Sequence, residues 1–283
     1  TEHKYVQSLM CLIDVYQNPL LELLSPPIVA GKSRNKAPPP ILSSKEISNI
    51  FCNVEQIYFL NSKFLKSLRQ NFQPVERNKG EKVKVGATFV KFSHFFKMYS
   101  IFCNDHERAQ TLIGEYQSRN KAFDTFLSQA RQDPRTGGFD IQTFLIMPIQ
   151  RIPRLKLLLE EIMKCTPPDH EDYAPLTKGL NILSSVATLI NEAIHERQNR
   201  LKVWAISQMM THVPFNLLEP HRLLLHEGFL SKICRKGQVR RWYFFLFSDC
   251  LVYARKVANN WYRFHQRIKV CVRASTGRCF CGF

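Results

Sequence analysis

The spacing of apolar residues changes once along this 283-residue chain, near residue 220, and the change limits the folds open to it. Before it, apolar side chains recur at three- and four-residue intervals, as at Val6, Leu9 and Ile13, which is the period of an amphipathic helix. After it come short aromatic and β-branched segments separated by turn-like residues, which is typical of an antiparallel meander. We therefore predict an elongated all-α helical bundle over residues 1–212 and a β-rich domain over residues 213–283.

About six helices are expected in the first part of the chain. Prolines and cations in residues 25–40 predict a solvated connector, and Ser43 or Ser44 can cap the helix that follows. A charged loop near residues 76–84 and a turn at residues 133–138 supply further breaks. The predicted helices cover residues 1–24, 43–68, 88–103, 105–131, 139–165 and 170–208.

Composition narrows the function without choosing it. The formal net charge of +17 favours an acidic partner: nucleic acid, anionic lipid or an acidic protein. No run approaches the roughly 18 to 20 apolar residues that cross a bilayer, and the first residues do not read as a signal peptide. The nine cysteines are scattered, which is typical of reduced thiols in the cytoplasm.

The sequence offers no constellation for covalent chemistry, and neither a cofactor nor a metal is expected. Gly31-Lys32-Ser33 imitates the end of a phosphate-binding loop, but Pro26 occupies the position where that motif requires glycine. Cys279 and Cys281 are the one close cysteine pair, and a single C-x-C lacks the further ligands that zinc needs.

Residues 144–173 form the most informative segment. Pro148 and Pro153 lie inside a strongly helical run, where each costs on the order of 3 kcal/mol, so we infer that tertiary contacts impose the helix. Ile146, Gln150 and Arg154 share one face at four-residue spacing. A separate apolar line should face the core: Leu145, Ile149, Ile152, Leu159 and Ile162.

An uncharged polar stripe is expected along the last long helix. It comprises Ser184, Thr188, Asn191, His195 and Gln198. A solvated face is normally richer in charge, and asparagine is a modest helix former. The stripe therefore indicates either a binding surface or a polar packing seam.

Four motifs in order resemble the Dbl-homology domain. Leu145, Pro148, Gln150-Arg151 and Arg154 match its third conserved region, L-x-x-P-x-Q-R-x-x-R-Y. Thr1-Glu2 with Tyr5-Val6 matches the first, Ile50-Phe51 with Asn53 matches the second, and Ile190-Asn191-Glu192 matches the last helix. The segments HEGFLSKI and RRWYFFLFSDCLVYARK are similar to the opening strands of a PH domain, which looks incomplete at residue 283.

This resemblance implies a guanine-nucleotide exchange factor for a Rho-family small GTPase, acting without covalent chemistry. It implies that Glu2 contacts the first switch loop of the GTPase, that Arg154 and Asn191 contact the second, and that Ile146 reads the partner's identity and favours Rac-type GTPases. Gln150, Arg151 and His195 are assigned to the same surface, although Gln150 and Arg151 can instead brace helices. Leu155 stands where the family has tyrosine, and Met147 where a basic residue is common.

In the β-rich domain the resemblance implies weak binding of anionic lipid through Lys232, Lys236, Arg240 and Arg241. A cytoplasmic protein recruited to the inner face of the plasma membrane is the corresponding expectation. The alternative is a basic membrane-binding scaffold that keeps the fold without exchange activity. Nucleic-acid binding is disfavoured, because most aromatic residues follow the apolar helical period and are not interleaved with cations.

Overall fold

The structure is a computed structural model that describes residues 1–24, 40–77, 83–233, 237–257 and 261–270. Its contacts divide the chain into two compact units, Thr1–Ala193 and Ile194–Phe283. Gly31-Lys32-Ser33, Lys236 and the Cys279–Cys281 pair lie outside the described residues.

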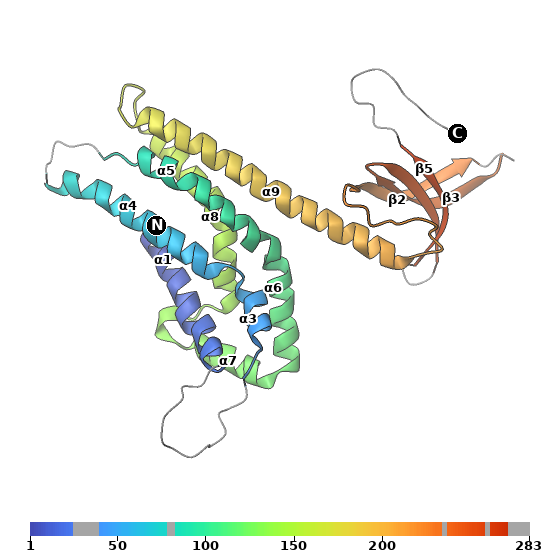
Figure 1. The fold of residues 1–283 in the computed structure, drawn as a ribbon, viewed down its shortest axis with the longest axis horizontal. Helices are drawn as coiled ribbons and strands as arrows, with labels where there is room; N and C mark the ends of the chain where they lie inside the picture. Colours follow the sequence, from blue (N-terminus) through green and yellow to red (C-terminus); the bar gives the residue numbers. More distant parts are fainter. Residues whose placement is uncertain (25–39, 78–82, 234–236, 258–260, 271–283) are drawn as a thin grey trace, which may run out of the picture. The chain divides into compact units, whose positions relative to one another are not determined.

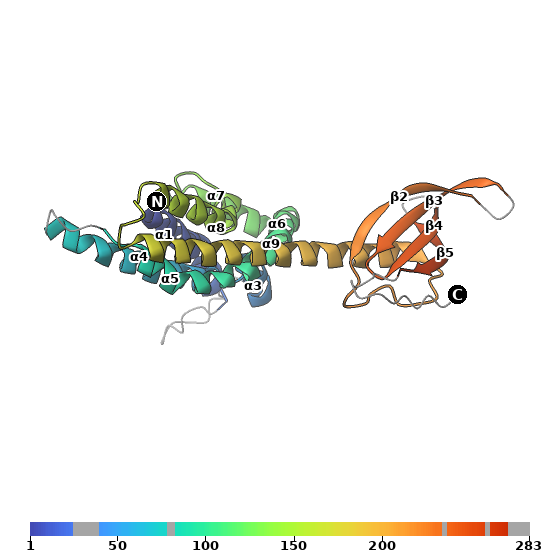
Figure 2. The ribbon, with the colours of Figure 1, turned by 90° about the horizontal axis from the view of Figure 1, so that it is seen from above.

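The first unit is a bundle of helices (Figures 1 and 2). Helix α1 packs against both α4 and α8, while α6 packs against α3, α7 and α8. The predicted helical architecture is confirmed, and the described segments are α1 (Glu2–Cys11), η1 (Leu12–Gln17), α2 (Asn18–Glu22), α3 (Ser44–Phe51), α4 (Val54–Arg77), α5 (Gly86–Ser93), η2 (His94–Met98), α6 (Tyr99–Arg119), α7 (Lys121–Arg131), η3 (Pro134–Thr136), α8 (Ile141–Lys164) and α9 (Tyr173–Met209), which continues into the second unit.

Local capping explains where two of these helices begin. Ser43 is the N-cap of α3, and its backbone N–H donates to Glu46 Oε2 at 2.7 Å while Ser43 Oγ accepts from the Glu46 backbone. The hydrogen bonds from Ser43 lower the pKa of Glu46. At α7, Asn120 Oδ1 accepts from the backbone N–H groups of Ala122 and Phe123. Both helices therefore satisfy first-turn donors that would otherwise lack partners.

Two of the predicted helical regions differ from the structure. The helix expected over 1–24 contains a π-helical stretch, η1, and there Tyr16 Oη donates to the carbonyl of Phe139 at 2.9 Å. The helices expected over 88–103 and 105–131 break instead at the 3₁₀ turn η2 and at Asn120. In both places side chains form hydrogen bonds with other parts of the bundle, and the apolar spacing within one helix does not reveal such contacts.

Helix α8 runs without interruption through Pro148 and Pro153, as predicted. Pro148 is buried and Pro153 is exposed. Of the expected core line, Leu145, Ile152 and Leu159 are buried, whereas Ile162 near the end of the helix is 37% exposed.

A buried polar contact joins the middle of the bundle. Tyr5 Oη on α1 and Tyr99 Oη on α6 are 3.0 Å apart, and Asn61 Nδ2 on α4 donates to the same Tyr99 oxygen at 2.8 Å. Burial raises the pKa of both phenols, so the hydroxyl groups stay protonated and remain available as donors. These three side chains link three helices through groups that would be costly to bury alone.

The loop before α9 fixes the start of α5. The buried carboxylate of Asp172 accepts hydrogen bonds from the backbone N–H groups of Val85, at 2.7 Å, and Gly86, at 3.0 Å. A Cβ atom at Gly86 would lie 2.6 Å from the backbone nitrogen of Leu176, which is too close for any side chain. The contact therefore requires glycine at this position, for reasons of space rather than backbone conformation.

The second unit is a five-stranded sheet in the order β1-β5-β4-β3-β2. The strands β2 (Leu224–Ile233), β3 (Val239–Phe247), β4 (Cys250–Lys256) and β5 (Tyr262–Lys269) form the predicted antiparallel meander. The two-residue β1 (Met210–Thr211) lies before the predicted meander and was not expected, and it pairs in parallel with β5. β1 follows α9 directly, so the helix delivers it to that edge.

The end of α9 belongs to the core of this second unit. Val203 and Ile206 pack with Phe245, Phe247 and Val252 from the sheet. The units consequently divide at residues 193 and 194, whereas the sequence period placed the boundary at residues 212 and 213. The apolar spacing of a helix is the same in either unit, so a helix that passes from one unit into the next shows no change of spacing at the boundary.

A buried ion pair ties the loop before β2 to the β3–β4 turn. Arg222 donates to both carboxylate oxygens of Asp249, at 2.8 and 2.7 Å, and to the backbone carbonyls of Asn216 and Leu217. Only 3% of the Arg222 side chain is exposed. The hydrogen bonds from Arg222 lower the pKa of Asp249 to about 2.

Gly86→Ala should destabilise the first unit by about 2 kcal/mol or more, because the added methyl group meets backbone atoms that cannot turn aside. Urea unfolding followed by the helical circular-dichroism signal measures the change. Gly114→Ala on α6 is the matched control: no atom lies within 4 Å of the added Cβ, so stability should rise by about 0.5 to 1 kcal/mol. Equal effects of the two substitutions would contradict the packing argument.

Asp249→Asn should destabilise the second unit at neutral pH by about 2 kcal/mol, since the pKa falls from 3.8 to about 2 on folding. A depressed carboxyl pKa stabilises above the unfolded value and loses that effect as pH falls through the folded value. The difference between wild type and variant should therefore shrink between about pH 4 and pH 2.

The natural fluorophores allow this measurement on the second unit alone. The chain has three tryptophans, Trp204, Trp242 and Trp261, and all lie after residue 193. Denaturant unfolding at several pH values, followed by tryptophan fluorescence, gives the stability of that unit. A difference that persists unchanged to pH 2 would show that the ion pair does not supply it.

Candidate functional site

Glu2 lies in the first turn of α1 and forms an ion pair with Arg151 of α8. Their side chains are 13% and 5% exposed. The guanidinium carbon of Arg151 also lies 4.3 Å from the centre of the Tyr5 ring, a cation–π contact. Glu2 Oε2 is buried and has no hydrogen-bond partner within the described residues. Arg151 Nε and Nη2 likewise have no hydrogen-bond partner there, so opposite charge is what joins the two side chains.

The sequence left two roles open for Arg151, a contact with the GTPase or a brace between helices, and this geometry favours the brace. The side chain lies in the interior, where it pairs with Glu2 and covers Tyr5, so it braces α1 against α8. Loss of solvation lowers the pKa of Arg151 to about 10, with a smaller contribution from the like charge of Arg154. The group is still charged at neutral pH, which the buried partner carboxylate requires.

The predicted face of α8 is present. Ile146 is half-buried, and Gln150 and Arg154 are exposed. Arg154 Nη2 donates to Gln150 Oε1 at 2.7 Å, one helical turn away. The planar guanidinium is therefore oriented by its neighbour and still carries donors that face solvent.

On α9, both Asn191 and His195 are exposed, whereas Ile190, next to Asn191, is buried. Thr188 Oγ1 donates to the carbonyl of Ser184 at 3.2 Å, so part of the polar stripe is satisfied within the helix. The division between the two units falls between Asn191 and His195.

One exposed leucine beside Arg154 was missed as a candidate in the sequence. Leu157 on α8 is 60% exposed. It follows Arg154 by three residues, which places both on one helix face. That spacing was the available signal.

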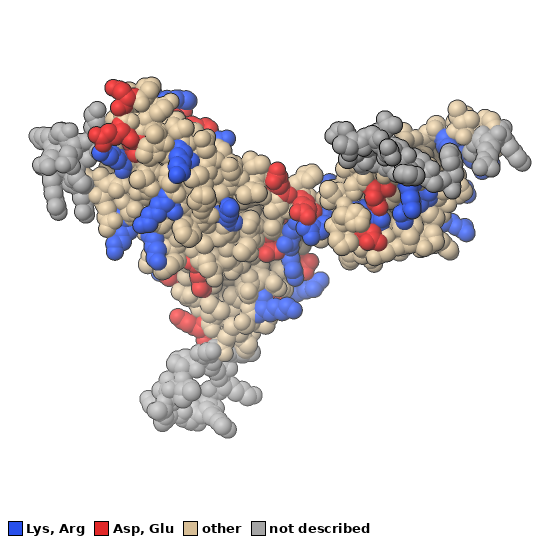
Figure 3. Space-filling model, turned by 45° about the horizontal axis from the view of Figure 1, so that its top comes forward, with Lys and Arg blue, Asp and Glu red and all other residues tan. Residues whose placement is uncertain are grey.

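The predicted lipid-binding cations of the second unit are only partly free. Lys232 Nζ donates to Tyr253 Oη and lies 4.1 Å from the centre of that ring, while Arg241 lies 4.4 Å from the centre of the Phe229 ring. Arg240 Nη2 donates to Gln238 Oε1 at 3.0 Å and is exposed. On the face seen in Figure 3, basic side chains are spread among neutral and acidic ones and do not gather in one patch.

The exposed groups are of the kinds that bind a partner through hydrogen bonds and apolar contacts. Within the described ranges, no group of three histidine, cysteine or acidic side chains is placed to hold a metal ion. In that same part of the chain, no helix has the length and apolar character to span a bilayer. The guanidinium of Arg154, the amide of Asn191 and the exposed Leu157 offer donors, an acceptor and apolar surface to a protein partner.

Comparison with known proteins identifies the family and the fold. A family model described as the RhoGEF domain matches residues 1–191. In Dictyostelium discoideum, "Guanine exchange factor for Rac 30" is 32% identical over 255 residues, covering 89% of this chain and 14% of that protein. Myosin-M heavy chain of the same organism is 30% identical over 234 residues, covering 82% of this chain and 12% of that protein. The chain therefore spans only a small part of each relative.

Solved structures share the fold of both parts. The DH/PH domains of PDZ-RhoGEF, in a crystal structure of their complex with GTP-gamma-S activated RhoA, match with a TM-score of 0.76 and 17% identity, covering 95% of this chain and 76% of that chain. An activated truncation of Vav1 matches with a TM-score of 0.74 and 19% identity, covering 95% and 62%. With a helical unit, a following sheet, and a family model matched over residues 1–191, this chain belongs to the RhoGEF domain family.

Proposed function

We propose that this chain promotes GDP release from a Rho-family small GTPase and its reloading with GTP. Membership of the RhoGEF domain family supports the reaction. The names of relatives support the partner class, since one is described as an exchange factor for Rac and another structure contains RhoA bound to DH/PH domains. No bond of the protein is made or broken, so no cofactor enters the proposal.

The mechanism is differential binding. A surface that binds the nucleotide-free GTPase more tightly than the loaded form lowers the free energy needed to release the nucleotide. In the proposal, Glu2 meets the first switch loop, and Arg154 and Asn191 meet the second. Ile146 and Gln150 complete this surface in the first unit, while Arg151 positions Glu2. His195, four residues after Asn191 on the same helix, stays a prediction.

The observation that carries the proposal is the match of the RhoGEF domain model to residues 1–191, the range that contains Glu2, Arg154 and Asn191. Arg154 and Asn191 are exposed, so a GTPase can reach both side chains. The ion pair of Glu2 with Arg151 holds the first turn of α1 beside α8, the helix that carries Arg154.

Arg154→Ala and Asn191→Ala should each slow exchange about tenfold or more, equivalent to about 1.4 kcal/mol, without change in the melting temperature. Both side chains are exposed, so their removal should not disturb the core. Release of fluorescent GDP from Rac, Rho and related GTPases measures the rate. Arg119→Ala and Asn181→Ala, exposed on α6 and α9, are matched controls and should leave it unchanged.

The alternative function, a scaffold with this fold and no exchange activity, gives a different result in the same assay. It is supported if wild type accelerates GDP release from none of the GTPases. If wild type is active and both site variants retain its full rate, the reaction stands and the assigned surface is wrong.

Ile146 should give the chain a preference for Rac over Rho. Its branched side chain is half-buried at the edge of the proposed surface, where one apolar contact can discriminate between partners by roughly 1 to 3 kcal/mol. Ile146→Ala should reduce exchange on Rac more than on Rho, as measured by the ratio of the two rates. A wild-type preference for Rho, or an equal loss on both, assigns Ile146 to packing.

Weak attraction to anionic membrane is a second proposal for the second unit, and recruitment from the cytoplasm to the inner face of the plasma membrane goes with it. The exposed Arg240 and the net charge of +17 favour it, although Lys232 and Arg241 already contact aromatic rings. Co-sedimentation with phosphatidylserine vesicles that falls with added salt and with Arg240→Glu supports it. Co-sedimentation that neither added salt nor Arg240→Glu reduces contradicts it.

A further inference from the structure

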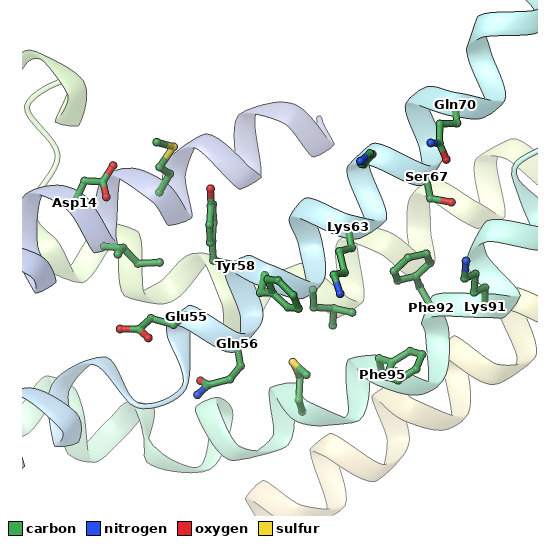
Figure 4. A pocket seen from close by; sticks show the side chains of 16 residues that line it. Asp14, Glu55, Gln56, Tyr58, Lys63, Ser67, Gln70, Lys91, Phe92 and Phe95 are labelled. Atoms are coloured by element: carbon green, nitrogen blue, oxygen red, sulfur yellow. The ribbon is translucent and has the colours of Figure 1, made fainter.

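A groove of about 1070 Å³ runs along α4 in the first unit, away from the residues assigned to the GTPase. One wall is α4 itself, and α1 with η1, and α5 with η2, supply the others. Figure 4 shows the lining side chains following α4 from Glu55 to Gln70. At a rise of 1.5 Å per residue, that stretch is about 22 Å long, or about four helical turns. None of the described residues of the proposed exchange surface lines it.

The floor of the groove is apolar and unusually exposed. Phe59 is 60% exposed, Phe95 is 58% exposed and Met10 is 49% exposed. Phe92 and Met98 extend the same floor. Side chains of this size are enriched in binding surfaces when they are clustered in a concavity, because covering them removes much apolar area from water.

Charge is separated along the groove. Asp14 and Glu55 lie toward one end, and Lys63 and Lys91 lie toward the other, as Figure 4 shows. The acidic end is already hydrogen-bonded: Gln17 Nε2 donates to Glu55 Oε1 at 2.8 Å, and Asn18 Nδ2 donates to Asp14 Oδ1 at 3.4 Å.

The basic end offers unpaired cations. Lys63, Lys66 and Lys91 line it, and none of the three forms an ion pair within the described part of the chain. Lys63 Nζ lies 4.0 Å from the centre of the Phe59 ring, and Lys91 Nζ lies 5.7 Å from that of Phe92. The cations therefore border the apolar floor, where an occupant's carboxylates would meet them while its apolar side chains cover the rings.

We propose that this groove binds an amphipathic helix of a partner protein, with its apolar face on the floor and acidic residues toward Lys63, Lys66 and Lys91. The length of about four turns and the row of apolar side chains match helix-in-groove recognition. A membrane is a poorer occupant, because Asp14 and Glu55 would face its anionic surface. A second copy is also poorer, because two concave surfaces cannot fill each other.

The probe is a pair of designed helical peptides of about 18 residues, enough for the four turns. Both carry leucine at every third or fourth position. One has glutamate on the flanks of its N-terminal half, and the other has lysine at the same positions. Binding is measured by fluorescence anisotropy of the labelled peptides, and its location by ¹³C-methyl NMR of methionine.

The methionines report the groove directly. Met10 and Met98 line it, whereas Met210 lies in the core of the second unit. The acidic peptide should shift the first two methyl signals and not the third, and should bind at least about tenfold more tightly than the lysine peptide. Equal affinity of the two peptides, or shifts that spare Met10 and Met98, would overturn the proposal.

Charge reversal supplies the test of the basic end. A variant with Lys63→Glu, Lys66→Glu and Lys91→Glu should lose about tenfold or more in affinity for the acidic peptide and gain affinity for the lysine peptide. A control with Lys45→Glu, Lys121→Glu and Lys202→Glu changes the net charge equally at exposed positions outside the groove. Equal losses in both variants would mean that only overall charge attracts the peptide.

The remaining outcomes name other occupants. Phosphatidylserine vesicles that shift Met10 and Met98 as the acidic peptide does would replace the helix with a lipid surface. Shifts that depend on protein concentration without peptide would indicate a second copy. The charge-reversal variant should promote GDP release from a GTPase at the wild-type rate, because its three lysines lie outside the proposed exchange surface. Peptide binding is measured without a GTPase, so the groove is tested even if the exchange proposal fails.

Discussion

A continuous run of buried polar contacts holds four helices of the first unit together. It begins at the ion pair of Glu2 with Arg151, passes through the cation–π contact to Tyr5, and continues from Tyr5 Oη to Tyr99 and Asn61. Glu2 is 13% exposed and the other groups are buried, so each depends largely on its neighbour for the interactions that water would otherwise supply. The position of α1 relative to α4, α6 and α8 follows from this dependence, and so does the direction in which Glu2 points.

The sequence located the helices because capping and apolar spacing are local. Ser43 and Glu46 lie three residues apart and form their capping box within one turn. Arg151 is different: a charged side chain is rarely buried, and this one is buried in contact with Glu2 and Tyr5, at the other end of the first unit's sequence. Its spacing from the buried Pro148 and Leu155 places it on the inner face of α8, but that spacing does not show which partner balances its charge.

The same distinction explains the other differences. Met210 and Thr211 continue directly from a helix and carry no alternation of their own, so their parallel pairing with β5 was not predictable. The groove was hidden for a related reason. Phe59 and Phe95 fit the apolar content expected of helices, and only the assembled bundle leaves them exposed and beside unpaired lysines.

The π-helical stretch η1 bears on how this helix would tolerate a deletion. A π turn holds about one residue more than an α turn, so it stores an extra residue inside an otherwise continuous helix. Deleting one residue there would remove the bulge and let α1 run into α2 as an ordinary α-helix. Glu2, in the turns before the bulge, would keep its register with Arg151, whereas Tyr16 lies inside the bulge and would lose the position from which it reaches Phe139. The extra residue thus serves the bond between Tyr16 and Phe139 and not the Glu2–Arg151 pair.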